Sequence, residues 1–260
     1  MTPAEDYLAQ CHRIIDAINA QRPAIEQAAD WFTESILAGR VVHVFGSGHS
    51  RIPAEEMWPR YGSFAGFHPI VELSLTFHNP VVGANGQRQA MFLENVSGLA
   101  ARILRNFDLS SDDSALVISS SGTNIVPVEI AEQFQQSGIK VVSIMGMDHS
   151  ASSNAKRDDG KKLSDYSDLI VDTAIPVGDS MVNIEGLPTP VSPGSSIASC
   201  AIVNAIKAET AMRLTAANRP PKVLTAASIV GPDESTRLFE SAYDEHAHRI
   251  AKLYENVGVE

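Results

Sequence analysis

A Gly-Ser-Gly-His-Ser turn at residues 46–50 carries the side chains best suited to hold a charged ligand. It follows an apolar, β-branched run at 41–45, which predicts a short buried strand. A predicted helix begins directly after it, near Arg51. The two glycines let the backbone turn sharply and approach a ligand, and the helix start offers unpaired N–H groups at the positive end of its dipole. With the hydroxyls of Ser47 and Ser50, this turn predicts a cradle for an anion such as phosphate.

A second cluster of hydroxyl side chains at 119–124 follows another predicted strand at 114–118 and precedes a predicted helix. Ligands of parallel sheets sit beyond the carboxyl ends of the strands, so two such turns are expected to face one polar ligand. The alternative is that each is an ordinary turn whose Ser or Thr caps a helix. The predicted substrate-binding residues are Gly46, Ser47, Gly48, Ser50, Ser119, Ser120, Ser121, Gly122, Thr123 and Asn124.

Short apolar strands alternate with helical segments along the chain, which is typical of a parallel sheet covered by helices on both faces. The expected strands are 41–45, 67–73, 114–118, 140–145 and 168–172. The expected helices are 3–38 with an interruption at Pro23, 50–60, 89–106, 125–137, 193–217 and 234–256, and the expected loops include 74–88 and 173–194. The sequence thus predicts an α/β fold, a three-layer αβα sandwich around a five-stranded parallel sheet.

No linker rich in Pro, Gly or Ser divides the 260 residues, so a single structural domain is expected. Within it we distinguish a helical N-terminal extension at 1–38, the sheet-containing part at 39–218 and a helical C-terminal tail at 219–260.

The composition excludes several classes of protein. A net charge of −11 opposes nucleic-acid binding, and no apolar run reaches the ~18 residues of a membrane helix. The first residues lack the basic and apolar regions of a signal peptide. Cys11 and Cys200 suggest neither a disulfide framework nor a zinc site. We therefore expect a cytoplasmic protein with no metal and no cofactor that binds neither nucleic acid nor a membrane.

The two hydroxyl-rich turns resemble the two signatures of the sugar isomerase (SIS) domain, over roughly residues 35–215. Within that family, the Gly-His-Ser turn followed by Ala-Glu-Glu is similar to a phosphoheptose-isomerase-like group. The segments Leu93-Glu94-Asn95 and Pro193-Gly194-Ser195-Ser196 also fit this group. The resemblance implies a flavodoxin-like fold and a homodimer or homotetramer. It also implies a phosphosugar ligand whose anion is held by Ser47, Ser50, Ser119, Ser121 and Thr123.

The resemblance further implies an aldose–ketose isomerase that works through an enediol, which requires a base and a group for ring opening. The catalytic candidates are Glu56, His49, Glu94 and Glu55. Adjacent helical residues point about 100° apart, so only one of Glu55 and Glu56 is expected to face the ligand, and Glu56 is preferred. His49 is the candidate for ring opening.

Other histidines carry less specific signals. His68 and His78 lie near the end of the expected strand at 67–73, where they would reach a ligand. His43, in the middle of a strand, is expected to be a core residue. His246 lies on an apolar stripe of the last helix and is expected to be packed.

Two alternative functions stay open. One is a non-catalytic sensor or regulator that binds a sugar phosphate, and the other is a lyase of the etherase kind acting on an amino-sugar phosphate. The helix at 193–217 lacks the histidine that phosphoheptose isomerases carry there and has Lys207 and Glu209 instead, which opposes heptose chemistry. A dinucleotide-binding turn is disfavoured because Arg51 stands where the third glycine is needed, although Glu72 lies at the spacing of a ribose-binding acid.

Overall fold

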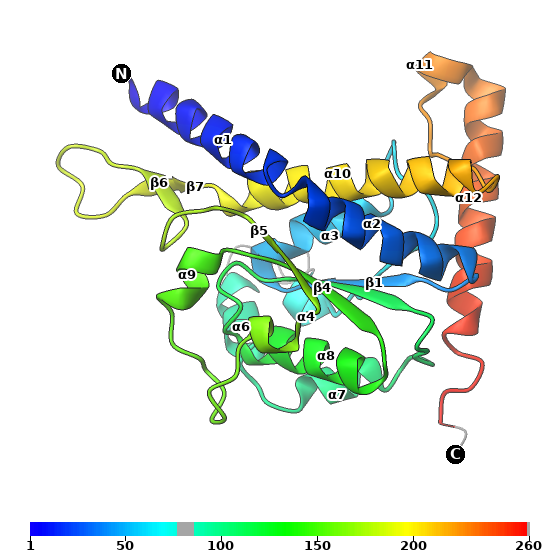
Figure 1. Ribbon diagram of the computed structural model, residues 1–260, viewed down its shortest axis with the longest axis horizontal. Coiled ribbons are helices and arrows are strands. Elements are labelled where there is room, and N and C mark those ends of the chain that lie inside the picture. Colours follow the sequence, from blue (N-terminus) through cyan, green and yellow to red (C-terminus); the bar gives the residue numbers. More distant parts are fainter. Residues whose placement is uncertain (77–85, 259–260) are drawn as a thin grey trace.

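A computed structural model describes residues 1–76 and 86–258 (Figure 1). Its centre is a five-stranded sheet in the order β2-β1-β3-β4-β5, and all neighbouring strands pair in parallel. The strands are β1 (Val42–Gly46), β2 (Phe67–Pro69), β3 (Ser114–Ile118), β4 (Lys140–Met145) and β5 (Leu169–Asp172). The predicted α/β sandwich with five parallel strands is confirmed.

The central strands are buried on both faces, as their largely apolar sequences predict. In β1, Val42 and Val44 contribute to the core under one helical layer and Phe45 to the core under the other. Val42 pairs with Ser114 and Gly46 with Ile118, so β1 and β3 end at the same level of the sheet. The turns that follow these two strands therefore start side by side.

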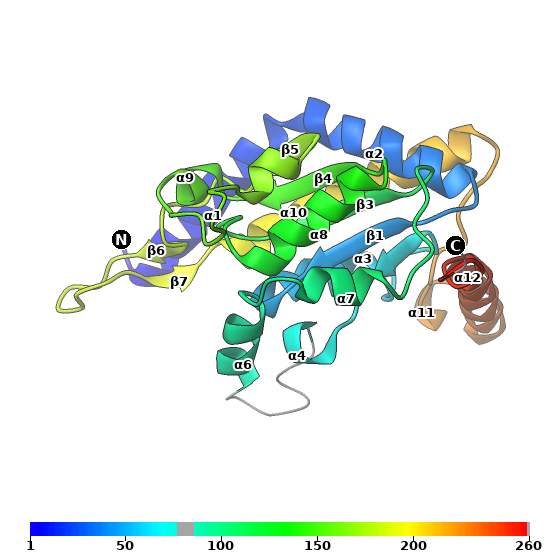
Figure 2. The same ribbon diagram turned by 90° about the horizontal axis from the view of Figure 1, so that it is seen from below.

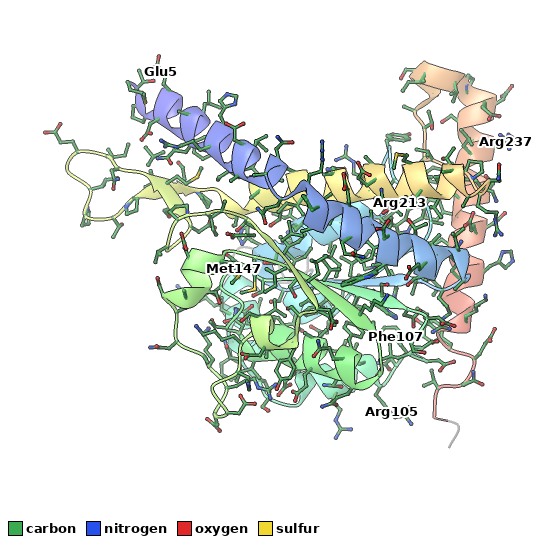
Figure 3. All side chains as sticks on the ribbon, in the orientation of Figure 1. Glu5, Arg105, Phe107, Met147, Arg213 and Arg237 are labelled. Carbon is green, nitrogen blue, oxygen red and sulfur yellow. The ribbon has the colours of Figure 1, made fainter. Side chains whose placement is uncertain are left out.

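Helices cover both faces of the sheet. Figure 1 shows α2 (Arg22–Leu37) and α10 (Ser195–Ala216) above it, with α7 (Leu99–Leu104) and α8 (Ile125–Gln136) below. Figure 2, seen from below, shows α8 crossing in front of the strands. Charged side chains such as Arg105 and Arg237 point away from these layers into solvent (Figure 3).

Prolines and glycines set several boundaries that differ from the sequence prediction. The N-terminal helical segment is two helices, α1 (Pro3–Asn19) and α2, with Pro23 in the first turn of the second. The strand expected at 67–73 ends at Pro69. The helix expected at 50–60 is a 3₁₀ turn at Gly48–Ser50 followed by α3 (Arg51–Met57), which ends before Pro59.

The helix expected at 89–106 is broken into α6 (Gly86–Leu93) and α7. Gly98 has a φ of +83° at the start of α7. The Glu129 carboxylate, on α8, accepts hydrogen bonds from the Ser97 hydroxyl at 2.7 Å and from the Gly98 N–H at 2.9 Å. A side chain 31 residues away thus holds the break in place.

Smaller elements complete the chain. They are α4 (Leu73–Thr76), α9 (Met147–Ala151), a 3₁₀ turn at Leu163–Tyr166, β6 (Ser180–Val182), β7 (Val191–Pro193), α11 (Ala227–Val230) and α12 (Pro232–Lys252). Strands β6 and β7 form an antiparallel hairpin inside the loop expected at 173–194. Of the loop expected at 74–88, residues 77–85 lie outside the described residues. None of the described helices is long and apolar enough to cross a bilayer.

Candidate functional site

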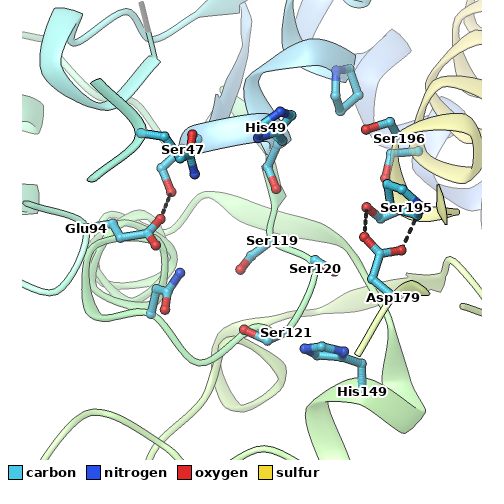
Figure 4. Close-up of a pocket in the computed structure, with 17 residues that line it drawn as sticks. Ser47, His49, Glu94, Ser119, Ser120, Ser121, His149, Asp179, Ser195 and Ser196 are labelled. Carbon is cyan, nitrogen blue, oxygen red and sulfur yellow. Dashed lines mark hydrogen bonds between the residues drawn. The ribbon is translucent and has the colours of Figure 1, made fainter. Parts of the chain in front are cut away.

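A cavity of about 360 Å³ opens at the carboxyl ends of β1 and β3. These strands flank the point where the strand order reverses, which is where ligands bind in doubly wound sheets. The volume falls within the roughly 300–1,000 Å³ of small-molecule sites. The lining residues are Ser47, Gly48, His49, Ser50, Pro53, Gln87, Glu94, Ser119, Ser120, Ser121, Asn124, His149, Asp179, Pro193, Ser195, Ser196 and Ser199 (Figure 4).

The turn after β1 forms one wall of the cavity. A Cβ on Gly46 would lie 2.1 Å from the Ser50 carbonyl oxygen, so only glycine allows the chain to fold back this closely. Gly48 has a φ of +56°. The Ser47 hydroxyl points away from its own helix start and donates to the Glu94 carboxylate at 2.7 Å (Figure 4). Ser47, His49 and Ser50 all line the cavity.

The turn after β3 forms the floor. Gly122 has a φ of +64°, and a Cβ there would lie 2.4 Å from the Met145 Cε. The Gly122 N–H donates to the Ser119 Oγ at 3.2 Å, and the Ser121 and Thr123 hydroxyls lie 2.9 Å apart. Gly122 and Thr123 therefore shape the turn from behind, while Ser119 and Ser121 line the cavity.

In the turn after β3, the Ser120 hydroxyl differs from its neighbours in its hydrogen bonding. Its hydroxyl oxygen is buried and has no hydrogen-bond partner among the described residues. A buried polar group without a partner costs about 1–3 kcal/mol. A ligand atom that hydrogen-bonds to this hydroxyl would remove that penalty.

The third wall is the start of α10, where Ser195, Ser196 and Ser199 face the cavity. The Asp179 carboxylate accepts hydrogen bonds from the Ser195 N–H at 2.7 Å, the Ser195 hydroxyl at 2.5 Å and the Gly194 N–H at 3.0 Å. A negative charge is favourable at the positive end of this 22-residue helix. Because Asp179 already occupies that position, the two other turns remain for the anion of a ligand.

His149 lies on α9, just after β4, and adds an imidazole to the cavity. Its Nδ1 accepts a hydrogen bond from the Gly178 N–H at 2.8 Å. Neither His149 nor Asp179 is among the predicted site residues. The available signals were weak: His149 follows the carboxyl end of a strand, and Asp179 lies in the long loop expected at 173–194.

Glu94 is the one predicted catalytic carboxylate that the structure places at the cavity. Glu94 lies just after α6, in the break before α7, and its backbone joins α6 to α8. The Glu94 N–H donates to the Ala90 carbonyl of α6, and the Val126 N–H of α8 donates to the Glu94 carbonyl, each at 2.9 Å. Its side chain is buried against Ser47. The carboxylate is thus fixed at the cavity wall.

The structure does not place the preferred candidate at the cavity, since neither Glu56 nor Glu55 is among its lining residues. Glu56 accepts hydrogen bonds from the Arg60 Nη1 at 2.6 and 2.8 Å and from the Asn204 Nδ2 at 2.9 Å. Burial raises the pKa of the Glu56 carboxyl, but the hydrogen bonds from Asn204 and Arg60 outweigh it and lower that pKa overall. Glu55 is exposed and lies 3.3 Å from Arg51.

The expectation that His68 would reach a ligand also changes. His68 does not reach the cavity: it is buried on β2, and its Nδ1 lies 3.1 Å from the Nδ1 of His43, which is a core residue as expected. Glu72 accepts the Leu75 N–H at 2.9 Å and so caps α4. His78 lies outside the described residues.

Side chains of both charge signs lie at or near the cavity. No lysine or arginine is among its described lining residues, but the Lys156 amine donates to the Asn124 Oδ1 at the rim. This contact leaves the Asn124 NH₂ as a donor for a ligand. In the described ranges, 1–76 and 86–258, no three His, Cys, Asp or Glu side chains are grouped so as to hold a metal ion.

Two solved structures are among those similar to this chain. A solved phosphoheptose isomerase from Francisella tularensis has a TM-score of 0.49 and 16% identity, covering 81% of this chain and 98% of that one. The sugar isomerase domain of a transcription factor from Sphaerobacter thermophilus has a TM-score of 0.48 and 15% identity, covering 93% and 98%.

Relatives found by sequence share a higher identity with this chain than these two structures do. A UPF0309 protein of Listeria innocua is 30% identical over 221 residues, which cover 85% of this chain and 87% of the relative. A UPF0309 protein of Halalkalibacterium halodurans is 31% identical, covering 88% and 92%. The family model of the SIS domain matches residues 6–146, more than half of the chain. The chain therefore belongs to the SIS domain family.

Proposed function

We propose that this protein binds a phosphorylated sugar in the cavity and interconverts its aldose and ketose forms. The observation that carries the proposal is a buried carboxylate, Glu94, fixed by Ser47 at the edge of a hydroxyl-lined cavity. Hydroxyls and helix N-termini are suited to hold a phosphate, and a fixed carboxylate is suited to move a proton between neighbouring carbon atoms.

The phosphate is expected to lie between the two turns. Ser50, Ser119 and Ser121 offer hydroxyls, and Ser120 offers a buried hydroxyl that lacks a partner. Asn124, the N-cap residue of α8, lines the cavity and makes no side-chain capping bond, so its NH₂ group is a further donor. With a net charge of −11, attraction of the anion rests on these local groups and on Lys156 at the rim.

Glu94 is the proposed base. Isomerisation of an aldose moves one proton from C2 to C1 through an enediol and one from the O2 hydroxyl to O1. A carboxylate on one side of the bound sugar removes the C2 proton and returns it at C1. The Ser47 hydroxyl, which donates to Glu94 Oε2, holds the carboxylate in one orientation for both transfers.

The test combines binding and turnover. A panel of pentose, hexose, heptose and amino-sugar phosphates is screened by thermal shift, and every ligand found is followed by NMR in D₂O. We expect deuterium to enter at C2 as the aldose and ketose interconvert. Ser50→Ala and Ser121→Ala should weaken binding, and Glu94→Gln should lower kcat about 10²–10⁴-fold while binding persists.

Glu56→Gln is the matched control, because this glutamate lies outside the cavity and should leave turnover near that of wild type. The proposal fails if no phosphosugar raises the melting temperature, or if Glu94→Gln retains full turnover. Binding without turnover would instead identify a sensor. Release of an ether-linked group from an amino-sugar phosphate would identify a lyase.

A further inference from the structure

We infer that His149 serves as a neutral hydrogen-bond donor to the substrate oxygen that becomes negative in the enediol step, a role that rests on the function proposed above. His149 is half-buried on α9 and lines the cavity. Figure 4 shows its ring pointing toward Ser121, with Glu94 on the opposite side of the Ser119–Ser121 turn. A sugar held by this turn would therefore have the carboxylate on one side and the imidazole on the other.

The contact with Gly178 decides which ring nitrogen carries the proton. The Gly178 N–H donates to the His149 Nδ1 at 2.8 Å, so this nitrogen must present its lone pair. A neutral imidazole with an acceptor at Nδ1 carries its hydrogen on Nε2. Nε2, at the tip of the ring, is then a donor aimed into the cavity.

The loop that supplies this N–H is held at both ends. The Asp179 N–H donates to the Pro176 carbonyl at 2.9 Å, which closes a turn around Gly178. The Asp179 side chain is bonded to the start of α10 through Ser195 and Gly194. The position of the Gly178 N–H is thus tied to the wall of the cavity, which keeps the imidazole in one tautomer.

The helix that carries His149 is also anchored. The Met147 N–H, in the first turn of α9, donates to the Asp172 Oδ1 at 3.0 Å. Asp172 is the last residue of β5, so α9 is fixed to the carboxyl edge of the sheet. A donor held by rigid elements needs little rearrangement when charge develops on the substrate.

His49, the histidine expected to act in ring opening, lacks these constraints. It lines the same cavity, but it is exposed and its ring makes no hydrogen bond to the described residues. Nothing in the described chain therefore selects its tautomer. Of the two histidines at the cavity, only His149 has a defined proton position.

The proposed step conserves atoms and electrons. Glu94 takes the C2 proton; the C2–H electron pair forms the C1=C2 bond, and the π pair of the C1 carbonyl moves onto O1. The His149 Nε2–H donates to O1 and keeps its proton, as a neutral imidazole does when it polarises a carbonyl. O1 then receives the O2 proton, the electron pair left on O2 forms the C2 carbonyl, and the C1=C2 pair takes the proton back from Glu94 at C1.

The first measurement is independent of turnover. ¹⁵N NMR of histidine-labelled protein, with His149→Gln used to assign the signals, should show His149 at pH 7 as a neutral ring protonated at Nε2. A ring protonated at Nδ1, or at both nitrogens, would overturn the inference.

The second measurement uses the phosphosugar that wild type isomerises and its hydroxamate analogue, a planar mimic of the enediolate. His149→Ala should lower kcat about 10²–10³-fold, as loss of one preorganised donor does, with a much smaller change in KM. It should also weaken hydroxamate binding more than substrate binding. His149→Gln, which retains an N–H donor, should recover part of kcat. His12→Ala is the control, since His12 is an exposed histidine of α1 outside the cavity.

Equal losses of substrate and hydroxamate affinity in His149→Ala would indicate a structural role and overturn the inference. So would an unchanged kcat in this variant while Glu94→Gln is inactive, and that result would leave the proposed isomerase intact. Absence of turnover in wild type would refute the isomerase itself, and the role of His149 with it.

Discussion

Asp113 is expected to stabilise the fold through a buried ion pair at the edge of the sheet opposite the cavity. It precedes β3, and its carboxylate accepts hydrogen bonds from the Arg40 Nε at 2.9 Å, the Arg40 Nη2 at 2.8 Å and the Ser110 N–H at 2.9 Å. The His43 Nε2 lies 3.3 Å from the same carboxylate. Burial raises the pKa of Asp113, but His43 and Arg40 outweigh it and lower this pKa from 3.8 to about 2.

The shift in the Asp113 pKa gives the size of its contribution to the free energy of unfolding. A folded-state pKa below the unfolded one means that stability is present above pH 4 and is lost as the pH falls toward 2. A difference of nearly two pKa units corresponds to about 2 kcal/mol in the free energy of unfolding, of which about 1 kcal/mol is lost by pH 3. Asp113→Asn also leaves Arg40 charged with only 13% of its side chain exposed, so we expect a total loss of about 3–5 kcal/mol at pH 7.

Urea unfolding at several pH values between 7 and 3 measures both the stability lost on substitution and the stability lost as the pH falls. The stability of wild type should fall by about 1 kcal/mol more than that of Asp113→Asn across this range. Asp112→Asn is the matched control, since Asp112 is exposed and should change stability by no more than about 0.5 kcal/mol. Parallel pH dependences for wild type and Asp113→Asn would refute the argument.

Three further outcomes follow from single contacts. Gly46→Ala should destabilise the protein by more than about 2 kcal/mol and abolish phosphosugar binding, because its Cβ would collide with the Ser50 carbonyl; denaturant titration and calorimetry check this. Lys156→Ala should weaken binding of a phosphosugar several-fold in low salt and less in high salt, whereas Lys161→Ala, a lysine of the same loop that pairs elsewhere, should not. Burial lowers the pKa of His68 well below 6.5, so the unfolded chain takes up its proton first and wild type loses stability below pH 6.5. His68→Asn should therefore lose less stability than wild type between pH 7 and 5 in urea titrations, and an equal loss would contradict the assignment.

Much of the fold follows from local patterns. The apolar runs at 41–45 and 114–118 predict β1 and β3, because strands buried on both faces of a parallel sheet need apolar side chains throughout. The predicted bounds of helices and strands were wrong at segment ends and at the break before α7. There, Gly98 alone does not specify a break, and the Glu129 carboxylate that stabilises it comes from another helix.

The choice among the carboxylates shows why the proposed base was harder to predict. Glu56 and Glu94 both lie within predicted helices, at 50–60 and 89–106, and only the helix of Glu56 directly follows a hydroxyl-rich turn. Glu56 is bound by Asn204, 148 residues away, and so is held outside the cavity. Glu94 reaches Ser47, 47 residues away, only because the chain breaks between α6 and α7. Such partners have no signature in the neighbouring sequence.

The sequence by itself determined the two turns, Gly46–Ser50 and Ser119–Asn124, because their shape depends on glycines that bring the chain close to itself or adopt positive φ. The tertiary structure alone decided which acid and which imidazole share the cavity with them. Glu94 and His149 come from different connections of the sheet, and each is fixed by a contact with a residue far along the chain. Turn geometry is a local property of the backbone, whereas the partners and burial of a side chain are set by how distant segments pack.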